Sequence, residues 1–389
     1  MSKYQQSSLF IKRLGLEYPI IQSPMAGIST IKLASVISSN GGLGSIPLAS
    51  VDARKQSGID SIDKQLNEFK SLAKTNVVNV NFFCHNHEEQ QTPTATQTEN
   101  WHKLLGKASP SINKDIPSLQ KSNISLTEVE SNHPELFVQL LEKLVQCKPK
   151  VVSFHFGFPS QKAIKFLQEN GIMVFVTVTS VKEAKQLIDL KVDGLVSQGY
   201  EAGGHRGNFL LSEILDENLS TFSLFTQIKI IVDNASWKPF IIPAGGIMDG
   251  KTIENYLANG ASGVQLGTIF LSTPESNSND FIKNVVSESN DTPTIMTRLV
   301  SGKPARCLRT PFIQALIEDC DNLKLDDQPP YGYAYYGYKT MAGLLKDPRY
   351  GFYLAGQNYH QISPDFNTEQ VFLKLVDELK QAGFDAQAV

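Results

Sequence analysis

Eight short apolar runs recur along this 389-residue chain, and they constrain its fold more than any other feature. Most are followed by a glycine or polar turn and then by a helix-like pattern. Strands that are almost entirely apolar are typical of parallel strands buried on both faces. The runs occupy residues 19–24, 41–46, 77–83, 150–156, 172–178, 192–196, 240–244 and 263–268.

Eight strand–helix units in succession favour an α/β fold of the (β/α)8 type, the TIM barrel. A doubly wound open sheet is the structural alternative. The first run is not followed by the GxGxxG turn of dinucleotide-binding sheets, which counts against a domain of that kind.

Two regions interrupt the repeating pattern. Residues 84–132 form a polar insertion between the third and fourth runs, and the strand–helix alternation stops at about residue 275. We therefore expect a barrel over residues 1–274 that carries the insertion, followed by a mostly helical cap over residues 275–389. Part of the cap is expected to pack back on the barrel and to shape the pocket at its mouth.

Composition excludes several function classes. A formal net charge of −3 gives no electrostatic basis for binding nucleic acid or an anionic membrane. No apolar stretch approaches the ~20 residues that a membrane-spanning helix needs. Four cysteines without a CxxC pair indicate reduced thiols in an intracellular protein.

The N-terminus bears on the cellular location. Lys3, Lys12 and Arg13 precede the first acid, Glu17, which faintly resembles a mitochondrial presequence. The apolar run that starts at residue 19 leaves little room for a removable segment. We expect a cytoplasmic protein, with a mitochondrial location as the alternative, that is a monomer or a weak homodimer.

The segment 197–207 carries the richest chemistry in the chain. It follows the sixth apolar run and reads Ser-Gln-Gly-Tyr-Glu-Ala-Gly-Gly-His-Arg-Gly. Its glycines let backbone approach a ligand, His205 can exchange a proton near neutral pH, and Arg206 suits an anionic partner. The segment predicts a ligand site with acid–base chemistry. The alternative is a structural histidine whose ring nitrogens are tied to backbone.

In a barrel of this type the chemistry lies where the strands end, on the carboxyl face. Polar and glycine residues fall at several of these ends, and their convergence on one rim predicts the site. They are Pro24, Met25 and Ala26 at the end of the first run, Asn81 in the third, His155 in the fourth, Gln198, Gly203, Gly204 and His205 after the sixth, Gly245 and Gly246 after the seventh, and Gln265, Leu266, Gly267 and Thr268 in the eighth.

The glycine-bearing ends of the seventh and eighth runs match a phosphate cradle. Backbone N–H groups near the start of a helix bind an anion without a metal or a lysine. Ordinary turn glycines are the alternative. Asn81 and Gln198 could hydrogen-bond the polar edge of a ring, and the alternative for each is an amide satisfied within its own loop.

His155 is flanked by Phe154 and Phe156. Strand alternation turns it the opposite way from both phenylalanines, so it can point into the barrel mouth. A histidine packed in the core is the alternative.

Tyr331, Tyr335 and Lys339 recur every four residues, which places them on one face if the segment is helical. The alternatives are an ordinary packing face and a glycine-rich loop. The segment 84–87, Cys-His-Asn-His, lacks a second pair of ligands, so no metal site is predicted.

With these motifs, the chain resembles the nitronate monooxygenase family, formerly the 2-nitropropane dioxygenases. The resemblance runs in family order through the whole barrel, and Tyr331, Tyr335 and Lys339 are similar to the signature of its class I branch. The matching stretches are residues 19–27, 79–83, 153–157, 198–207, 244–247 and 265–268.

The resemblance implies a barrel that binds FMN non-covalently through the strand-end residues named above. It implies that the catalytic residue His205 lies beside the flavin and that His155, Tyr331, Tyr335 and Lys339 bind the substrate. The implied reaction oxidises an alkyl nitronate with O2 to a carbonyl compound and nitrite, without NAD(P)H. Propionate 3-nitronate is the substrate that the resemblance suggests.

Two rival functions also fit the barrel motifs. One is an NAD(P)H-dependent flavin reductase that acts on a quinone or an enoyl thioester. The other is a non-catalytic barrel that binds a phosphorylated metabolite.

Overall fold

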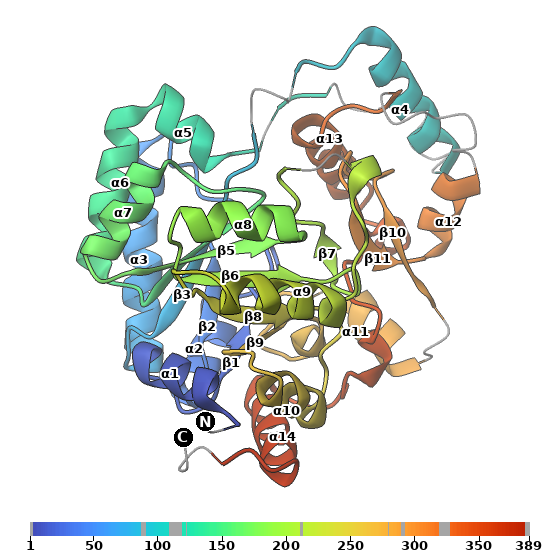
Figure 1. The fold of residues 1–389 in the computed structure, drawn as a ribbon. Coiled ribbons are helices and arrows are strands. Elements are labelled where there is room, and N and C mark those ends of the chain that lie inside the picture. Colours follow the sequence, from blue (N-terminus) through green and yellow to red (C-terminus); the bar gives the residue numbers. More distant parts are fainter. Residues whose placement is uncertain are drawn as a thin grey trace.

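The structure is a computed structural model that describes residues 3–86, 91–108, 119–121, 123–210, 213–278, 280–288, 292–318 and 327–385. Eight parallel strands form its centre (Figure 1), in the order β1, β9, β8, β6, β5, β4, β3, β2. A parallel bridge between Ile21 and Leu43 joins the two edge strands. The sheet therefore curls into a barrel, and the predicted TIM-type fold is confirmed. Its strands are β1 (Ile20–Gln22), β2 (Gly44–Pro47), β3 (Val78–Phe83), β4 (Val151–His155), β5 (Met173–Val178), β6 (Gly194–Gln198), β8 (Phe240–Ala244) and β9 (Val264–Leu266).

Side chains alternate between the two faces of the barrel wall. In β4, Phe154 packs beneath the helices, and Val151 lies in the barrel interior. Helix α1 (Gln5–Leu14) closes the interior at the amino ends of the strands, where Phe10 stacks on Phe175 at 6.2 Å. Because apolar side chains fill that end, the polar strand ends on the opposite face are the place for a ligand.

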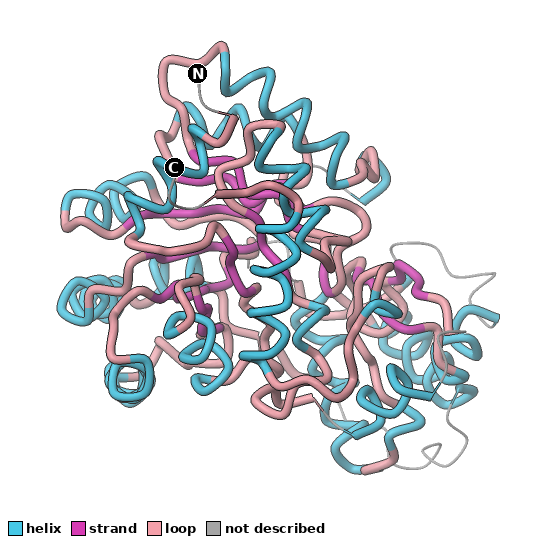
Figure 2. The backbone as a smooth tube through the Cα atoms, turned by 90° about the horizontal axis from the view of Figure 1, so that it is seen from below, coloured by secondary structure: helices cyan, strands magenta, loops and turns pink. Residues whose placement is uncertain are grey.

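A ring of helices surrounds the strands (Figure 2). Several begin at a residue whose side-chain oxygen accepts a hydrogen bond from a backbone N–H of the first turn, as Ser180 does for α8. Across the described residues, no helix is both long and apolar enough to cross a membrane. The ring consists of α2 (Ile31–Ser39), α3 (Gln56–Ala73), α6 (Pro134–Cys147), α7 (Gln161–Glu169), α8 (Val181–Asp189), α9 (Thr221–Asp233), α10 (Gly250–Ala258) and α14 (Thr368–Gln381).

The C-terminal helix α14 completes this ring. It packs against α10 and α2, and a capping box at Asn367 and Gln370 defines its first turn. Just beyond it, the ring of Phe384 lies 5.0 Å from that of Tyr4. The two ends of the described chain therefore meet on the barrel, far from the cap.

The polar insertion and the C-terminal region meet in space. Helix α4 (Ala95–Ala108) of the insertion packs on α12 (Pro311–Glu318), and both enclose a second hydrophobic core with α13 (Tyr331–Leu345). Trp101 and Phe312 are buried in that core. We call α4, α12, α13, β10 and β11 the cap; it occupies the upper right of Figure 1. The insertion therefore contributes to the cap, which its polar composition did not indicate.

A small antiparallel sheet attaches the cap to the barrel. It contains β10 (Thr294–Thr297), β11 (Ala305–Leu308) and β7 (Gly204–His205), with β11 in the middle. The sequence did not indicate these strands, because they are short and not continuously apolar. Two further helices are α5 (Leu126–Asn132), which packs against α6, and α11 (Asp280–Glu288).

Candidate active site

His205 lies where the barrel meets the cap. Within β7 it stands opposite Ala305 of β11. Its ring centroid is 5.2 Å from those of Tyr331 and Tyr335 and 6.1 Å from that of Phe156. The two tyrosines stack on each other at 5.5 Å along one side of α13. The segment is thus helical rather than a glycine-rich loop, and its helix brings both tyrosines to His205.

Ser301 determines which nitrogen of His205 carries the proton. The Nε2 atom of His205 lies 3.0 Å from the hydroxyl oxygen of Ser301. That hydroxyl donates to the carbonyl of Lys303 at 2.8 Å, so its oxygen accepts from the Nε2–H group. This tautomer follows from the partners. It leaves Nδ1 as the nitrogen that can accept a proton or a hydrogen bond.

Both histidines of the site are neutral at physiological pH. Burial, followed by the neighbouring groups His155, Lys303 and Lys339, lowers the pKa of His205 to about 3. Burial also lowers the pKa of His155 to about 4; a hydrogen bond with the backbone of His205 opposes this shift, and the charge of Lys303 adds to it. The Lys339 ammonium stands 4.4 Å from the centroid of the Tyr335 ring. Because the charges that act on His205 are cationic, the site attracts an anion.

Gln198 holds the turn that carries His205. Its amide nitrogen donates to the carbonyl of His205 at 3.0 Å, and its amide oxygen accepts from the N–H of Gly207 at 2.8 Å. Gly207 packs tightly on His155, since a Cβ there would lie 2.5 Å from Cε1 of the imidazole. These contacts satisfy most of the Gln198 amide within its own loop, which was the alternative to a ligand contact. Its second N–H remains available to a ligand.

Arg206 is bound inside the protein. Its Nε and Nη2 atoms donate to the two carboxylate oxygens of Asp216 at 2.6 and 3.0 Å. Nη1 donates to the carbonyl of Gln198 at 2.5 Å, and the residue is 2% exposed. The prediction that Arg206 meets an anionic ligand is therefore wrong. Its anion is Asp216, and the pair fixes the loop beneath His205.

The ends of β8 and β9 present backbone donors. Gly245 and Gly246 have φ angles of 125° and 70°, a region that favours glycine. Within the described ranges, no acceptor pairs with the N–H of Gly246 or of Gly267. Gly267 directly precedes the short 3-10 helix η3 (Thr268–Phe270). Free N–H groups at such a turn are the donors that a phosphate cradle requires.

A segment of the cap side covers this cradle. The N–H of Gly356 donates to the Thr268 hydroxyl at 3.0 Å, and the Asn358 amide donates to the carbonyl of Gly246 at 2.7 Å. A Cβ on Gly203 would lie 2.5 Å from the nitrogen of Gly356. Gly203 is thus required for close packing, whatever else it contacts. Residues 355–358 have no motif that marks them, so sequence reasoning missed them.

The loop after β1 borders the cradle from the other side. The sulfur of Met25 lies 3.2 Å from the position of a Cβ on Gly267. The Met25 N–H donates to the hydroxyl of Ser29 at 3.0 Å, which fixes the loop that also contains Pro24 and the exposed Ala26.

The remaining strand-end side chains differ in what they offer a ligand. The Asn81 amide donates to the Ser153 hydroxyl at 3.0 Å, and its carbonyl oxygen pairs with nothing else that the structure describes. Alternation turns Gln265 into the barrel mouth, because Leu266 is buried among the helix-facing residues. The Leu266 carbonyl accepts from the N–H of Ser23 at 2.7 Å. Because the Leu266 side chain points away from the mouth, the predicted cofactor contact from Leu266 would have to come from its backbone.

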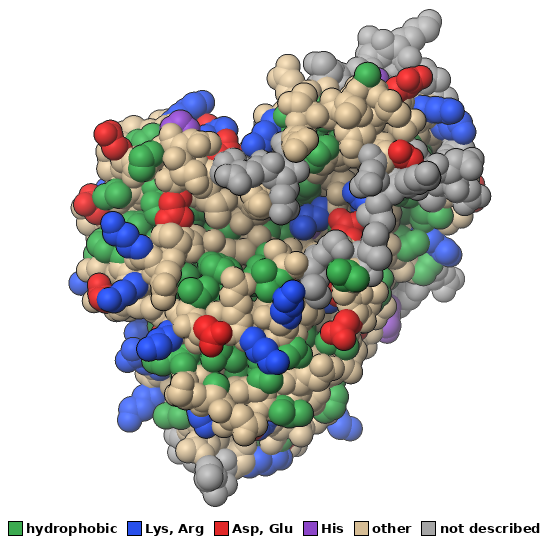
Figure 3. Space-filling model, turned by 45° about the horizontal axis from the view of Figure 1, so that its top comes forward, with side chains coloured by type: hydrophobic (Ala, Val, Ile, Leu, Met, Phe, Trp, Pro, Cys, Tyr) green, Lys and Arg blue, Asp and Glu red, His purple; other side chains and the backbone are tan. Residues whose placement is uncertain are grey.

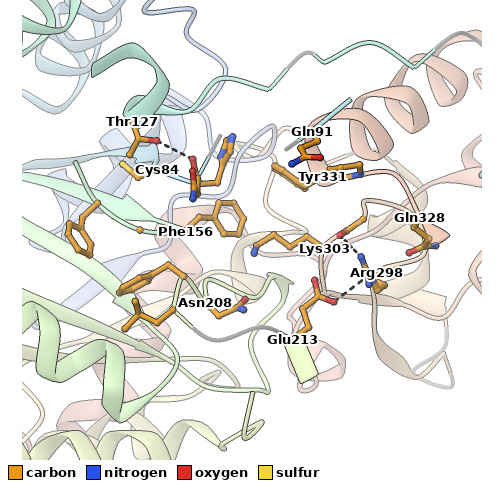
Figure 4. Close-up of a pocket in the computed structure, with 18 of the residues that line it drawn as sticks. Cys84, Gln91, Thr127, Phe156, Asn208, Glu213, Arg298, Lys303, Gln328 and Tyr331 are labelled. Carbon is orange, nitrogen blue, oxygen red and sulfur yellow. Dashed lines mark hydrogen bonds and ion pairs between the residues drawn. The ribbon is translucent and has the colours of Figure 1, made fainter. Parts of the chain in front are cut away.

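A cavity of ≈ 800 Å³ lies beside His205, between barrel loops, the insertion and the cap (Figure 4). Phe156 and Tyr331 line the cavity and also contact His205, so they separate the two. Figure 3 shows the surface notched between the barrel and the cap lobe. Of the predicted site residues, Tyr331 lines this cavity, whereas His205 and the glycine cradle do not. We therefore regard the cavity as an antechamber to the site.

Cys84 and His85 belong to the segment that was considered as a metal site, and both have other contacts in the structure. Burial raises the pKa of the Cys84 thiol well above its ordinary value, and the His85 ring pairs with the Asn123 amide. His87 lies outside the described residues. In the part of the chain that the structure describes, no three His, Cys, Asp or Glu side chains are grouped so as to hold a metal ion.

Comparison with known proteins agrees with this geometry. The family model described as "Nitronate monooxygenase" matches residues 7–378. The chain is 40% identical over 394 residues to a Saccharomyces cerevisiae protein named "Putative nitronate monooxygenase", covering 97% of this chain and 94% of the relative. It is 33% identical over 303 residues to a "Probable nitronate monooxygenase" of Staphylococcus aureus, covering 78% of each.

Solved structures share the architecture. A nitroalkane oxidase from Streptomyces ansochromogenes superposes with a TM-score of 0.78 at 26% identity, over 96% of this chain and 98% of that one. FabK from Thermotoga maritima superposes with a TM-score of 0.66 at 24% identity, over 95% of both chains, which is a likeness of fold alone. With a family model matched along almost its full length and a relative at 40% identity, the chain belongs to the nitronate monooxygenase family of enzymes.

Proposed function

We propose that this enzyme is an FMN-dependent nitronate monooxygenase of the class I branch. It oxidises alkyl nitronates with O2 to a carbonyl compound and nitrite, without NAD(P)H. The observation that carries the proposal is the environment of His205: a neutral imidazole between two tyrosines, acted on by the cations Lys303 and Lys339. A nitronate is an anion, and this enclosure attracts one while keeping bulk water away.

The barrel rim fits a flavin mononucleotide. The free N–H groups of Gly246 and Gly267 would bind the phosphate, and the amides of Asn81 and Gln265 would hydrogen-bond the polar edge of the ring system. Bound FMN supplies the electron-accepting chemistry that protein side chains lack. We also propose that the barrel part of residues 1–274 holds the cofactor, while the insertion and the cap part of residues 275–389 shape the substrate pocket.

His205 acts on the substrate through Nδ1, because Nε2 donates to Ser301. With a pKa of about 3, the neutral ring is a reluctant base towards a neutral nitroalkane. A nitronate arrives without that proton and needs only orientation. The Tyr335 phenol, whose pKa burial raises to about 12, keeps its proton and can donate to a nitro oxygen. The site therefore favours nitronates over nitroalkanes.

The cofactor and the rival function are tested together. Protein purified gently should be yellow and should release FMN, identified by chromatography, on denaturation. Under anaerobic conditions NADH should leave the flavin absorbance unchanged for many minutes, whereas propionate 3-nitronate should alter it. Rapid bleaching by NADH would favour a reductase, and colourless protein that cannot be reconstituted with FMN would overturn the flavin proposal.

A further inference from the structure

Phe156 has a backbone conformation that phenylalanine rarely adopts. Its φ angle is 67°, in the left-handed region, directly after β4 ends at His155. A bulky side chain in this region costs free energy, so the conformation persists only where the surroundings enforce it. Strained residues of this kind cluster at functional sites. The place of the Phe156 ring is therefore informative about function.

Close packing enforces the turn after β4. The N–H of Cys84 donates to the carbonyl of His155 at 2.8 Å. A Cβ on Gly157 would lie 2.8 Å from the carbonyl oxygen of Cys84, so only glycine fits there. From the other side, Gly207 packs on the His155 imidazole. The backbone is thus held on both sides of Phe156, and the turn cannot relax to move the ring away.

The left-handed turn changes the direction of the Phe156 ring. Strand alternation would place the ring with that of Phe154, which packs beneath the helices. Instead, its centroid lies 4.3 Å from that of His155, 6.1 Å from that of His205 and 5.7 Å from that of Tyr331. Figure 4 shows the ring in the middle of the residues that line the cavity. The strained backbone therefore brings the ring to the site.

Phe156 and Tyr331 each border two spaces. Both line the cavity of ≈ 800 Å³, which His205 does not line, and both rings contact His205. The ring of His85, also on the cavity wall, lies 6.2 Å from that of Phe156 and 5.7 Å from that of Tyr331. Phe156 is 3% exposed. A substrate chain that outgrows the enclosure around His205 meets these two rings before it reaches the antechamber.

We propose that Phe156 is a specificity-determining residue that limits how far the alkyl chain of a nitronate extends from His205. With the nitronate group against His205, the Phe156 ring separates the chain from the antechamber, so long chains are rejected. Removal of the ring joins the two spaces and lets a longer chain enter the antechamber. This inference rests on the proposed function, and it gives Phe156 a role that strand alternation did not indicate.

The test is the chain-length profile of the FMN-loaded enzyme, measured by oxygen uptake as kcat/KM for propyl 1-nitronate and octyl 1-nitronate. In the wild type, the octyl compound should be at least about tenfold less efficient, because a pocket rejects a chain for which it has no room. Phe156→Ala should reduce this difference to about twofold, chiefly through a gain with the octyl compound. Phe156→Leu, which keeps an apolar side chain and disturbs packing less, should give an intermediate ratio. Flavin absorbance and unfolding temperature verify that each variant is folded and loaded.

Phe158 supplies a matched control. It lines the same cavity two residues further along the chain, but its ring packs on that of Phe209 at 5.5 Å. Phe158→Ala should therefore leave the octyl-to-propyl ratio at the wild-type value. A shift as large as that of Phe156→Ala would show that the volume of the antechamber in general sets the profile, and would overturn the inference. Equal efficiency of the wild type with both nitronates would overturn it as well.

Binding without turnover separates this inference from the proposed function. A carboxylate, like a nitronate, is a planar anion with two oxygens, and this chemistry does not oxidise it. By calorimetry on the FMN-loaded protein, butanoate should bind to the wild type at least about tenfold more tightly than nonanoate, and Phe156→Ala should bind both with similar affinity. If the wild type turns over neither nitronate, the proposed function fails, and carboxylate binding still tests Phe156. If it turns over both while loaded Phe156→Ala and Phe156→Leu keep the wild-type ratios, the Phe156 inference alone fails.

Discussion

The barrel and the cap meet at His205 and hold it in different ways. On the barrel side, Gln198 and Arg206 make directed hydrogen bonds to backbone and to a carboxylate, and they fix the turn itself. On the cap side, Tyr331 and Tyr335 pack on the imidazole, and Ser301 makes a single hydrogen bond to it. The barrel therefore determines where the histidine stands, and the cap determines its proton, its charge environment and its access.

This difference indicates what a change on each side should affect. The cap is assembled from α4 of the insertion and from segments beyond residue 292, which enclose a core separate from that of the barrel. A change in the cap can reshape the antechamber without disturbing the cradle on β8 and β9. Disruption on the barrel side should therefore cost stability, and disruption on the cap side should cost activity or selectivity.

The largest effect is expected on the barrel side, from Arg206→Met. It leaves the Asp216 carboxylate, whose side chain is only 9% exposed, without its partner, and breaking a buried pair costs about 3–5 kcal/mol. The variant should unfold at a much lower temperature or denaturant concentration than the wild type. Lys165→Met, which removes an exposed pair with Glu169, should cost no more than about 0.5 kcal/mol. Equal unfolding midpoints for the two variants would show that Arg206 does not lock the turn.

At the junction of the barrel and the cap, His205→Asn should preserve the fold and the bound flavin but impair chemistry. Activity on neutral nitroalkanes should fall roughly a hundredfold or more, because a proton acceptor is lost, and activity on preformed nitronates should fall far less. Initial rates of oxygen uptake with each substrate measure this. His360→Asn, at an exposed histidine, should match the wild type. Equal losses on both substrate types would assign His205 to binding rather than proton transfer.

Ser301→Ala should have a smaller effect of a different kind. Loss of one hydrogen bond leaves the His205 ring free to take the other tautomer, which we expect to lower kcat about fivefold with little change in unfolding temperature. Nitrogen NMR of labelled histidine should show Nε2 protonated in the wild type and a mixture of tautomers in the variant. An unchanged spectrum would mean that another group sets the tautomer.

The pH dependence of stability tests the environment of the two histidines without any substitution. The pKa values of His155 and His205 lie below the ordinary 6.5, at about 4 and about 3. The unfolded chain therefore binds more protons, so stability is fully present above pH 6.5 and declines as pH falls towards about 3. Unfolding temperatures should drop over this window, and less steeply in a His155→Gln, His205→Asn double variant. Parallel curves would contradict neutral histidines in the folded state.

The barrel was predictable because its rules are local. Each apolar run, such as that of β5 (Met173–Val178), marks a strand buried on both faces, and the polar ends of parallel strands converge on one rim. The helical spacing of Tyr331 and Tyr335 likewise anticipated a shared face. Arg206 was the exception on the barrel side. Its cationic side chain suggested an anionic ligand, but its partner is Asp216, which lies in a loop with no motif.

The cap was less predictable because its contacts are distant in sequence. Nothing in the polar insertion indicates that Trp101 packs in a core with Phe312. The strands β10 and β11 are four residues each and lack continuous apolar character. Ser301 and Lys303 lie in the turn between these strands, so no pattern marks them until the turn is placed against His205.

The central claim is that the barrel cradle and the cap together oxidise a nitronate with O2. The direct measurement is oxygen consumption with nitrite release by the FMN-loaded enzyme on propionate 3-nitronate in air, without NADH. The account predicts turnover that saturates with substrate, yields nitrite and is not increased by NADH. Absence of nitrite and oxygen uptake in flavin-replete protein, or turnover only when NADH is present, would contradict it.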